Sequence, residues 1–164
     1  MSEQDATPTA RYRLLTEPVG TAYLRLLDVA SASCSEMLLV LRPDIPADAT
    51  ARSALEALES FLITRNRTSE WPSTRLFGGT ADVLRFRLTR SSAQVLQVSA
   101  SALYAWKQPA LPEDLCLFRS DGRLWLQSTA HEADAVLWLT NAERDFLASG
   151  GQDGLDLDRD PDEP

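Results

Sequence analysis

The sequence is poor in the residues that carry most metal and cofactor chemistry. It has one histidine, His131, and two cysteines, Cys34 and Cys116, among 164 residues. Two cysteines do not form a disulfide framework, and with one histidine they do not make a structural zinc site. We therefore expect no metal site, no cofactor, and two free thiols in a reducing compartment.

Motifs that mark phosphate binding or nucleophilic catalysis are also missing. The only adjacent glycines are Gly78-Gly79 and Gly150-Gly151, and neither pair belongs to a P-loop, a dinucleotide-binding fingerprint or a serine-hydrolase elbow. Glu132 follows His131, but a zinc protease needs a second histidine one turn later, where Ala135 stands. These absences favour a protein that is not an enzyme.

Long apolar runs are absent as well. No run approaches the roughly 18 residues of a membrane-spanning helix. The first ten residues are polar and lack the basic and apolar regions of a signal peptide. We expect a cytoplasmic protein with no membrane association. Lysine occurs once, at Lys107, and this bias towards arginine is typical of GC-rich bacterial coding sequences.

The composition that remains is that of one soluble globular domain. Apolar residues make up 44% of the chain and charged residues 24%, with a net charge of −8. Residues 151–164 hold six acids and one base, which favours a tail that keeps the protein soluble. We expect a disordered lead at 1–10, a single domain at 11–148 and an acidic disordered tail at 149–164.

Hydrophobic periodicity predicts alternating helices and strands in the first half. A helix is expected from about Thr21, a buried strand at 37–41, and a second helix capped by Asp44 or Asp48. Residues 82–88 alternate with period two, as in a half-buried strand.

The second half predicts an antiparallel meander. We expect a helix capped by Ser91 with an apolar stripe reaching Trp106, then a hairpin turning at Asp121-Gly122. A third strand at 135–139 precedes a helix capped by Thr140 and Glu143. The prediction is a single-domain α+β fold with about four helices, a mainly antiparallel sheet and a C-terminal three-strand meander.

The segment from 65 to 90 is the main candidate for a binding surface. Its six arginines and two acids give it a net charge of +4 within an acidic chain. Arginine and tryptophan dominate interface hot spots. The candidate residues in this segment are Arg65, Arg67, Trp71, Arg75, Arg85 and Arg87. The alternative is an ordinary sheet surface whose arginines pair with acids of a neighbouring strand.

Two further candidates, His131 and Glu132, fall in a predicted connection between strands. They could contact a partner, or His131 could serve Cys34 or Cys116 as a general base. Against a thiol dyad, Cys116 falls within a predicted strand, where cysteine usually acts as a small hydrophobe.

The leading hypothesis is a small non-enzymatic protein-binding module of the immunity-protein, antitoxin or adaptor kind. The eight candidate residues would contact an unidentified protein partner, and large apolar residues on both faces of the strands leave a homodimer open. One alternative is a thiol enzyme with a cysteine-histidine pair. The other is a nucleic-acid-linked regulator, which the net negative charge disfavours.

Overall fold

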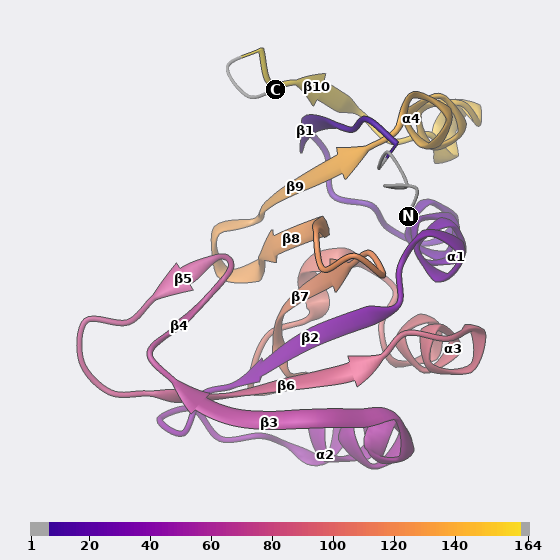
Figure 1. The fold of residues 1–164 in the computed structure, drawn as a ribbon. Helices are drawn as coiled ribbons and strands as arrows, with labels where there is room; N and C mark the ends of the chain where they lie inside the picture. Colours follow the sequence, from indigo (N-terminus) through magenta and orange to yellow (C-terminus); the bar gives the residue numbers. More distant parts are fainter. Residues whose placement is uncertain (1–6, 162–164) are drawn as a thin grey trace, which may run out of the picture.

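The computed structural model describes residues 7–161, whose strands form an eight-stranded sheet with four α-helices (Figure 1). The elements are β1 (Ala10–Leu14), α1 (Thr21–Ser33), β2 (Glu36–Leu41), α2 (Ala49–Leu58), η1 (Glu59–Phe61), β3 (Leu62–Thr68), β4 (Glu70–Trp71), β5 (Thr74–Arg75), β6 (Ala81–Arg87), α3 (Arg90–Ser99), η2 (Leu103–Ala105), β7 (Glu113–Phe118), β8 (Leu124–Thr129), η3 (Ala130–Glu132), β9 (Asp134–Leu139), α4 (Asn141–Ala148), η4 (Gly151–Asp153) and β10 (Leu157–Arg159). The η elements are single turns of 3-10 helix.

The sheet order is β10-β1-β9-β8-β7-β2-β6-β3, and neighbouring strands are antiparallel. Strands β7, β8 and β9 are consecutive neighbours, so the predicted meander is confirmed, as is the single-domain α+β class. The predicted turn at Asp121-Gly122 joins β7 to β8, and Gly122 has the positive φ of 86° that glycine tolerates best.

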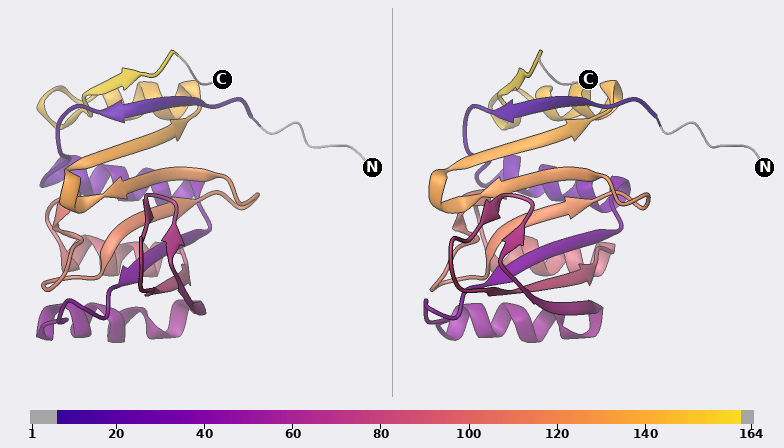
Figure 2. Two further views of the ribbon diagram at one scale, coloured as in Figure 1. Left: turned by 90° about the vertical axis from the view of Figure 1, so that its left-hand side faces the viewer. Right: turned by 60° about the vertical axis from the view of Figure 1, so that its left-hand side comes forward.

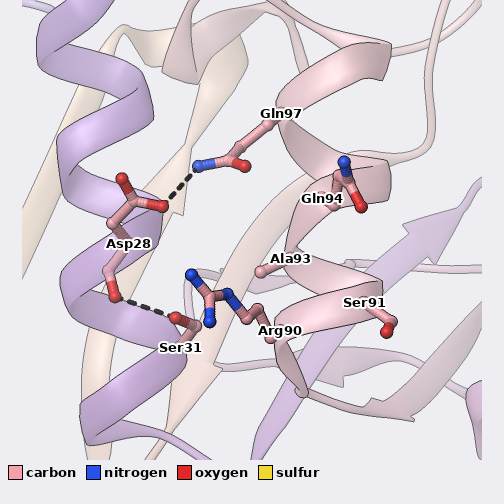
Figure 3. Close-up of a pocket in the computed structure, with 7 residues that line it drawn as sticks. All are labelled: Asp28, Ser31, Arg90, Ser91, Ala93, Gln94 and Gln97. Atoms are coloured by element: carbon pink, nitrogen blue, oxygen red, sulfur yellow. Dashed lines mark hydrogen bonds between the residues drawn. The ribbon is translucent and has the colours of Figure 1, made fainter.

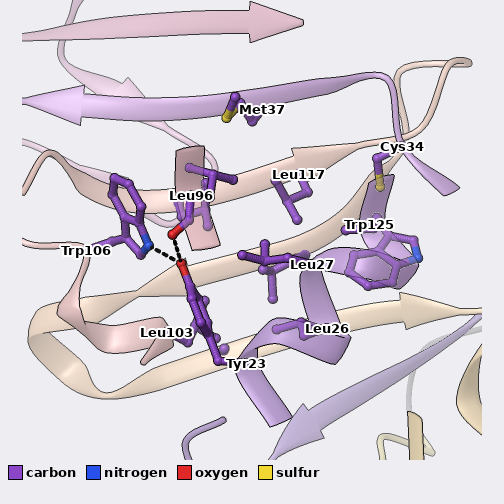
Figure 4. Close-up of a cluster of buried hydrophobic side chains, with 14 of the residues drawn as sticks. Tyr23, Leu26, Leu27, Cys34, Met37, Leu96, Leu103, Trp106, Leu117 and Trp125 are labelled. Carbon is purple, nitrogen blue, oxygen red and sulfur yellow. Dashed lines mark hydrogen bonds between the residues drawn. The ribbon is translucent and has the colours of Figure 1, made fainter. Parts of the chain in front are cut away.

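All four helices contribute to one core against a single face of the sheet. Tyr23 of α1 lies at its centre, where its hydroxyl donates to the Leu96 carbonyl of α3 at 2.7 Å (Figure 4). The Trp106 indole donates to the same hydroxyl oxygen at 2.9 Å. Burial raises the pKa of Tyr23 well above its ordinary value, so the phenol stays neutral.

The opposite face, called the open face below, carries no helix of residues 7–161 and is covered in part by the β4–β5 hairpin. Figure 2 shows this hairpin in front of the sheet, with the helices behind. Trp71 of the hairpin is only 6% exposed and packs in a second, smaller core. Its partners on the sheet are Leu38, Val40, Ala81, Val83, Cys116 and Phe118. The sheet therefore has apolar residues on both faces. The helices cover those on one face, and the hairpin of the same chain covers those on the other.

Helix α3 differs from its prediction at both ends. Its cap is Thr89, whose side chain accepts from the Ser92 amide while Ser92 reaches back to the cap backbone, so Ser91 is not the cap. The helix ends at Ser99 because Ala100 adopts an extended conformation. Trp106 was predicted to end the apolar stripe of this helix. It is fully buried, as that prediction implied, but it follows a 3-10 turn and lies outside the helix.

Other predicted caps are confirmed. Asp48 accepts from the amides of Thr50 and Ala51, and Thr140 forms a capping box with Glu143. Arg119 donates to both carboxylate oxygens of Glu143, at 3.0 and 2.7 Å. Burial alone would raise the pKa of Glu143, but the hydrogen bonds from Arg119 and the Thr140 amide outweigh it and lower the pKa.

The two chain ends differ from their prediction too. Residues 1–6 of the expected lead and 162–164 of the expected tail lie outside the described residues. Ala10 already belongs to β1, and the acidic segment returns to the sheet as β10. Leu155 is 7% exposed in the helix-side core. The prediction of a disordered tail from 149 is therefore wrong for the described part, because Leu155 and Leu157 supply apolar contacts that the acidic composition hid.

Replacing Leu155 with alanine tests this anchoring. Truncating a buried leucine removes apolar burial and leaves a cavity, so we expect a loss of about 2 kcal/mol in unfolding free energy by urea titration. Leu15→Ala is the matched control, since Leu15 is 60% exposed and its loss should stay within about 0.5 kcal/mol. Equal effects of the two substitutions would contradict the anchored tail.

Candidate functional site

Polar side chains gather in a cavity of about 200 Å³ between the β4–β5 hairpin and the ends of β7 and β8. Its polar lining comes from Arg42, Thr74, Glu113, Asp114, Thr129, His131 and Glu132, with Trp71 closing one side. We call this the hairpin pocket. It unites three of the eight predicted candidates, Trp71, His131 and Glu132, with two buried carboxylates that the prediction did not include.

A β-bulge puts those two carboxylates in one place. Between its pairings with Val40 and Leu38, strand β7 runs from Glu113 to Cys116, one residue more than β2 does. Asp114 absorbs the irregularity with a φ of 57°, in the left-handed region that few non-glycine residues adopt. Bulges redirect side chains and are frequent beside functional sites. Both Glu113 and Asp114 line the pocket, although neighbours in a regular strand point to opposite faces.

Asp114 holds the hairpin onto the sheet. Its Oδ2 accepts from the Trp71 indole nitrogen at 3.0 Å, and its Oδ1 accepts from the Ala130 amide at 3.1 Å. The residue is only 3% exposed, so these bonds form away from water. Hydrogen bonds to a buried charged group contribute about 1.5–3 kcal/mol each. One carboxylate thus connects β7, the hairpin and the β8–β9 connection.

Glu113 forms the second contact of the pocket. Its Oε1 lies 2.8 Å from His131 Nε2, and its side chain is 1% exposed. Glu113 Oε2 is buried and has no hydrogen-bond partner among the described residues. His131 is 45% exposed, so this pair links a buried carboxylate to the surface. Such a contact fixes the orientation of the imidazole.

The five predicted arginines do not converge on one surface. Arg65 and Arg67 of β3 both donate to Asp82, at 2.6 and 3.1 Å. Arg65 pairs across the sheet with Leu84, which belongs to the helix-side core. Arg65, Arg67 and Asp82 therefore share the helix side, because strand residues alternate between the faces.

The other three arginines belong to the hairpin and the open face. Arg85 stacks on Phe118, with its guanidinium 4.4 Å from the ring centre, and lies 3.5 Å from Glu36 of the neighbouring strand. Arg75 of the hairpin is 3.8 Å from Glu70, and Arg87 donates to the Ser60 carbonyl at 2.9 Å. A continuous cationic surface along residues 65–90, which nucleic-acid binding would use, is not formed.

The thiols lie away from the hairpin pocket lining. Cys116 is fully buried under the hairpin, and its Sγ donates to the Asp114 carbonyl at 3.4 Å. Cys34 is 8% exposed beside Trp125 (Figure 4). Burial raises the pKa of each thiol to about 12. His131 contacts Glu113 and no thiol, so the geometry gives no support to a cysteine-histidine dyad.

A larger depression of about 320 Å³ lies between α1 and α3 (Figure 3). Asp28 and Gln97 hydrogen-bond across it at 2.9 Å, and Arg90 extends towards α1. Exposed helix residues line most of it, and no candidate residue contributes. We place the candidate site at the hairpin pocket instead, because only there do buried carboxylates meet the predicted residues.

Comparisons with known proteins add no assignment: no protein-family model, no curated protein and no solved structure matches the chain. Within residues 7–161, no three histidine, cysteine or acidic side chains converge to hold a metal ion. No helix in that range has the length and hydropathy to cross a membrane.

Sequence reasoning missed Arg42, Glu113 and Asp114. One signal was present, since Glu113 and Asp114 stand directly before the apolar run at 115–118. Two adjacent acids opening a buried strand need partners, and partners in turn indicate a polar site. The bulge that directs both into the pocket depends on the pairing with β2 and left no mark in the sequence.

The Trp71–Asp114 bond can be measured by a double-mutant cycle. Trp71→Phe leaves most of the apolar contact but removes the indole donor, and Asp114→Asn removes the charge. We expect each to lower the unfolding free energy by about 1–3 kcal/mol, with a coupling energy of about 1 kcal/mol or more. Amide exchange should accelerate in the hairpin. Strict additivity of the two substitutions would contradict the contact.

Thiol titration tests the two cysteines. With a pKa of about 12, each thiol holds roughly 10³-fold less thiolate at pH 8 than an ordinary cysteine. We expect neither to react with Ellman's reagent in the folded protein at pH 8, and both to react in denaturant. Rapid reaction of either thiol in the folded state would restore the thiol-enzyme hypothesis.

Proposed function

We propose that this chain is a non-enzymatic protein-binding module of the immunity-protein, antitoxin or adaptor kind, acting in the cytoplasm. The single observation behind the proposal is the exposure of Phe77, which lies in the loop between β5 and β6 and is 99% exposed. A fully exposed aromatic ring contributes no apolar burial to the stability of the free protein. It gains apolar burial of 150 Å² or more when a partner covers it.

The structure beneath Phe77 favours binding without large rearrangement. Trp71 and Asp114 fasten the hairpin to the sheet, and the Leu76 amide donates to the Ser69 carbonyl at 2.7 Å across its base. Preorganisation matters because loops that are ordered only on binding lose affinity to conformational entropy. The hairpin therefore presents Phe77 from a fixed base.

Polar candidates belong to the same hairpin or to the pocket that it closes. Arg75 stands two residues before Phe77 with a side chain 75% exposed. His131 and Glu132 are exposed on the rim of the hairpin pocket. An apolar centre with a polar, solvent-accessible rim is the usual anatomy of a protein interface. The sequence predicts that Trp71 contacts the partner. Because Trp71 is buried, its role in this proposal is to support the binding surface from below.

The test compares Phe77→Ala with Val98→Ala, a truncation of an exposed apolar residue on α3 (78% exposed). Tagged protein would capture its partner from native lysate, and calorimetry with the purified partner would follow. We expect Phe77→Ala to weaken binding by about 2 kcal/mol, roughly 30-fold, with thermal stability unchanged. Val98→Ala should leave the affinity unchanged.

Two results would reject the proposal. One is a partner that binds both variants as tightly as the unaltered protein. The other is a stable protein that captures no partner under any growth condition in which it is produced.

A further inference from the structure

The hairpin pocket contains a buried acceptor that no residue of the described chain satisfies. Glu113 lines the pocket, and its side chain is 1% exposed. His131 Nε2 lies 2.8 Å from one of its oxygens, Oε1, whereas Oε2 is buried and has no hydrogen-bond partner among residues 7–161. A buried charge without a donor is costly, and buried polar groups in native proteins nearly always have a partner. Glu113 Oε2 therefore indicates that a ligand of this pocket would supply a hydrogen-bond donor.

The other buried acid of the pocket, Asp114, is already satisfied within the fold. Its Oδ2 accepts from the Trp71 indole, and its Oδ1 accepts from the Ala130 amide. These two bonds hold the hairpin in place, so a ligand that displaced them would release the wall of its own site. Asp114 can attract a cation by its charge, but the free hydrogen-bonding position belongs to Glu113.

The charges of the lining favour a positively charged ligand. The lining holds three acids and one arginine: Glu113, Asp114, Glu132 and Arg42. With His131 neutral, three carboxylates and one guanidinium leave a charge of −2. Arg42 is directed to an acid outside the lining, since its Nε lies 3.6 Å from Asp44 Oδ1. A cationic donor would satisfy Glu113 and offset this negative charge, and the net charge of −8 would assist its approach.

The apolar lining and the single free oxygen favour lysine over arginine. Trp71 and Ile45 line the pocket beside its polar groups, and the four-carbon stem of a lysine can pack against such surface. A guanidinium binds a carboxylate best through two parallel hydrogen bonds, which need both oxygens. His131 already occupies Oε1, so a single-point donor such as an ammonium fits better. The terminal torsion of a glutamate is soft, and a small rotation presents Oε2 to the pocket while Oε1 keeps its bond.

We propose that the hairpin pocket receives a lysine side chain of a partner protein. The lysine ammonium donates to Glu113 Oε2, and the charges of Asp114 and Glu132 add to the attraction. The stem of the lysine lies against Trp71 and Ile45. The inference rests on the proposed protein-binding function and names the kind of side chain that is recognised.

The test follows binding of a lysine probe to the full-length protein by NMR. The probe is acetyl-Gly-Lys-Gly-amide, and its neutral counterpart carries norleucine, which keeps the stem but lacks the ammonium. The Trp71 indole and the Ala130 amide report occupancy, because both bond to Asp114 in the wall of the pocket. We expect saturable shifts at millimolar probe and about tenfold weaker binding of the norleucine probe. The corresponding arginine probe should bind several-fold more weakly than the lysine probe.

Matched substitutions assign the contact to the pocket. Glu113→Gln keeps the size of the side chain and an acceptor for His131 but removes the charge, and it should weaken the lysine probe about tenfold. Arg42→Gln removes the opposing cation and should strengthen the probe several-fold. Glu56→Gln changes the net charge of the protein as Glu113→Gln does, at an exposed position on α2 outside the pocket, and should leave the affinity unchanged.

Three outcomes would overturn the inference: equal binding of the lysine and norleucine probes, lysine binding that Glu113→Gln leaves unchanged, or shifts confined to residues outside the pocket. The norleucine comparison uses unaltered protein, so it stands even if a variant fails to fold. Butylammonium that binds about tenfold more tightly than the lysine probe would make a free amine the ligand and would also reject the proposal.

The natural partner separates this inference from the proposed function. Phe77→Ala should weaken the partner and leave the lysine probe unchanged, whereas Glu113→Gln should weaken both. A partner that needs Phe77 but binds the Glu113→Gln variant as tightly as the unaltered protein would reject this inference alone. A partner that needs Glu113 and is indifferent to Phe77 would reject the role of Phe77 and keep the lysine pocket.

Discussion

The buried carboxylate of Asp114 is the contact on which the open face depends. It lies in a bulge of β7 and accepts the Trp71 indole and the Ala130 amide. Without it, the hairpin would lose its polar attachment, and the indole nitrogen would be buried without an acceptor. An unsatisfied buried donor costs about 1–3 kcal/mol. The left-handed backbone of Asp114 is the local strain that this arrangement carries.

The hairpin in turn covers apolar residues that the sheet would otherwise expose to solvent. Leu38, Val40 and Val83 face away from the helices, and each is 8% exposed or less. An uncovered patch of that kind would favour aggregation. Covering it with a hairpin instead of a helix leaves a thin layer with a free loop at its end. The hairpin that buries Trp71 therefore also leads into the exposed Phe77, two residues after the end of β5.

The sequence correctly predicted those features of the fold that depend only on residues close together in the chain. The cap at Thr140, the positive φ of Gly122 and the alternation around Leu84 each depend on a few adjacent residues, and each is confirmed. Strands β1, β3 and β10 were not predicted, because their sequences are short or polar and their pairing comes from distant neighbours. The hairpin pocket was half predicted. His131 and Glu132 stood out as polar residues in a connection, whereas Glu113 depends on a bulge set by β2.

The charge of this acidic protein is unevenly distributed along the sheet. Asp156, Asp158 and Asp160 accompany β10 and β1 at one end of the sheet, while Arg65 and Arg67 lie at the other. Glu56 and Glu59 line the same groove as Arg65, so charges of both signs meet at that end. Seven spacings of about 4.8 Å separate the two edges by roughly 34 Å. Screening at physiological salt acts over about 8 Å, so the acidic edge barely affects the field at β3. The net charge of −8 therefore describes the whole molecule, and the field at each edge of the sheet is set by the charges beside it.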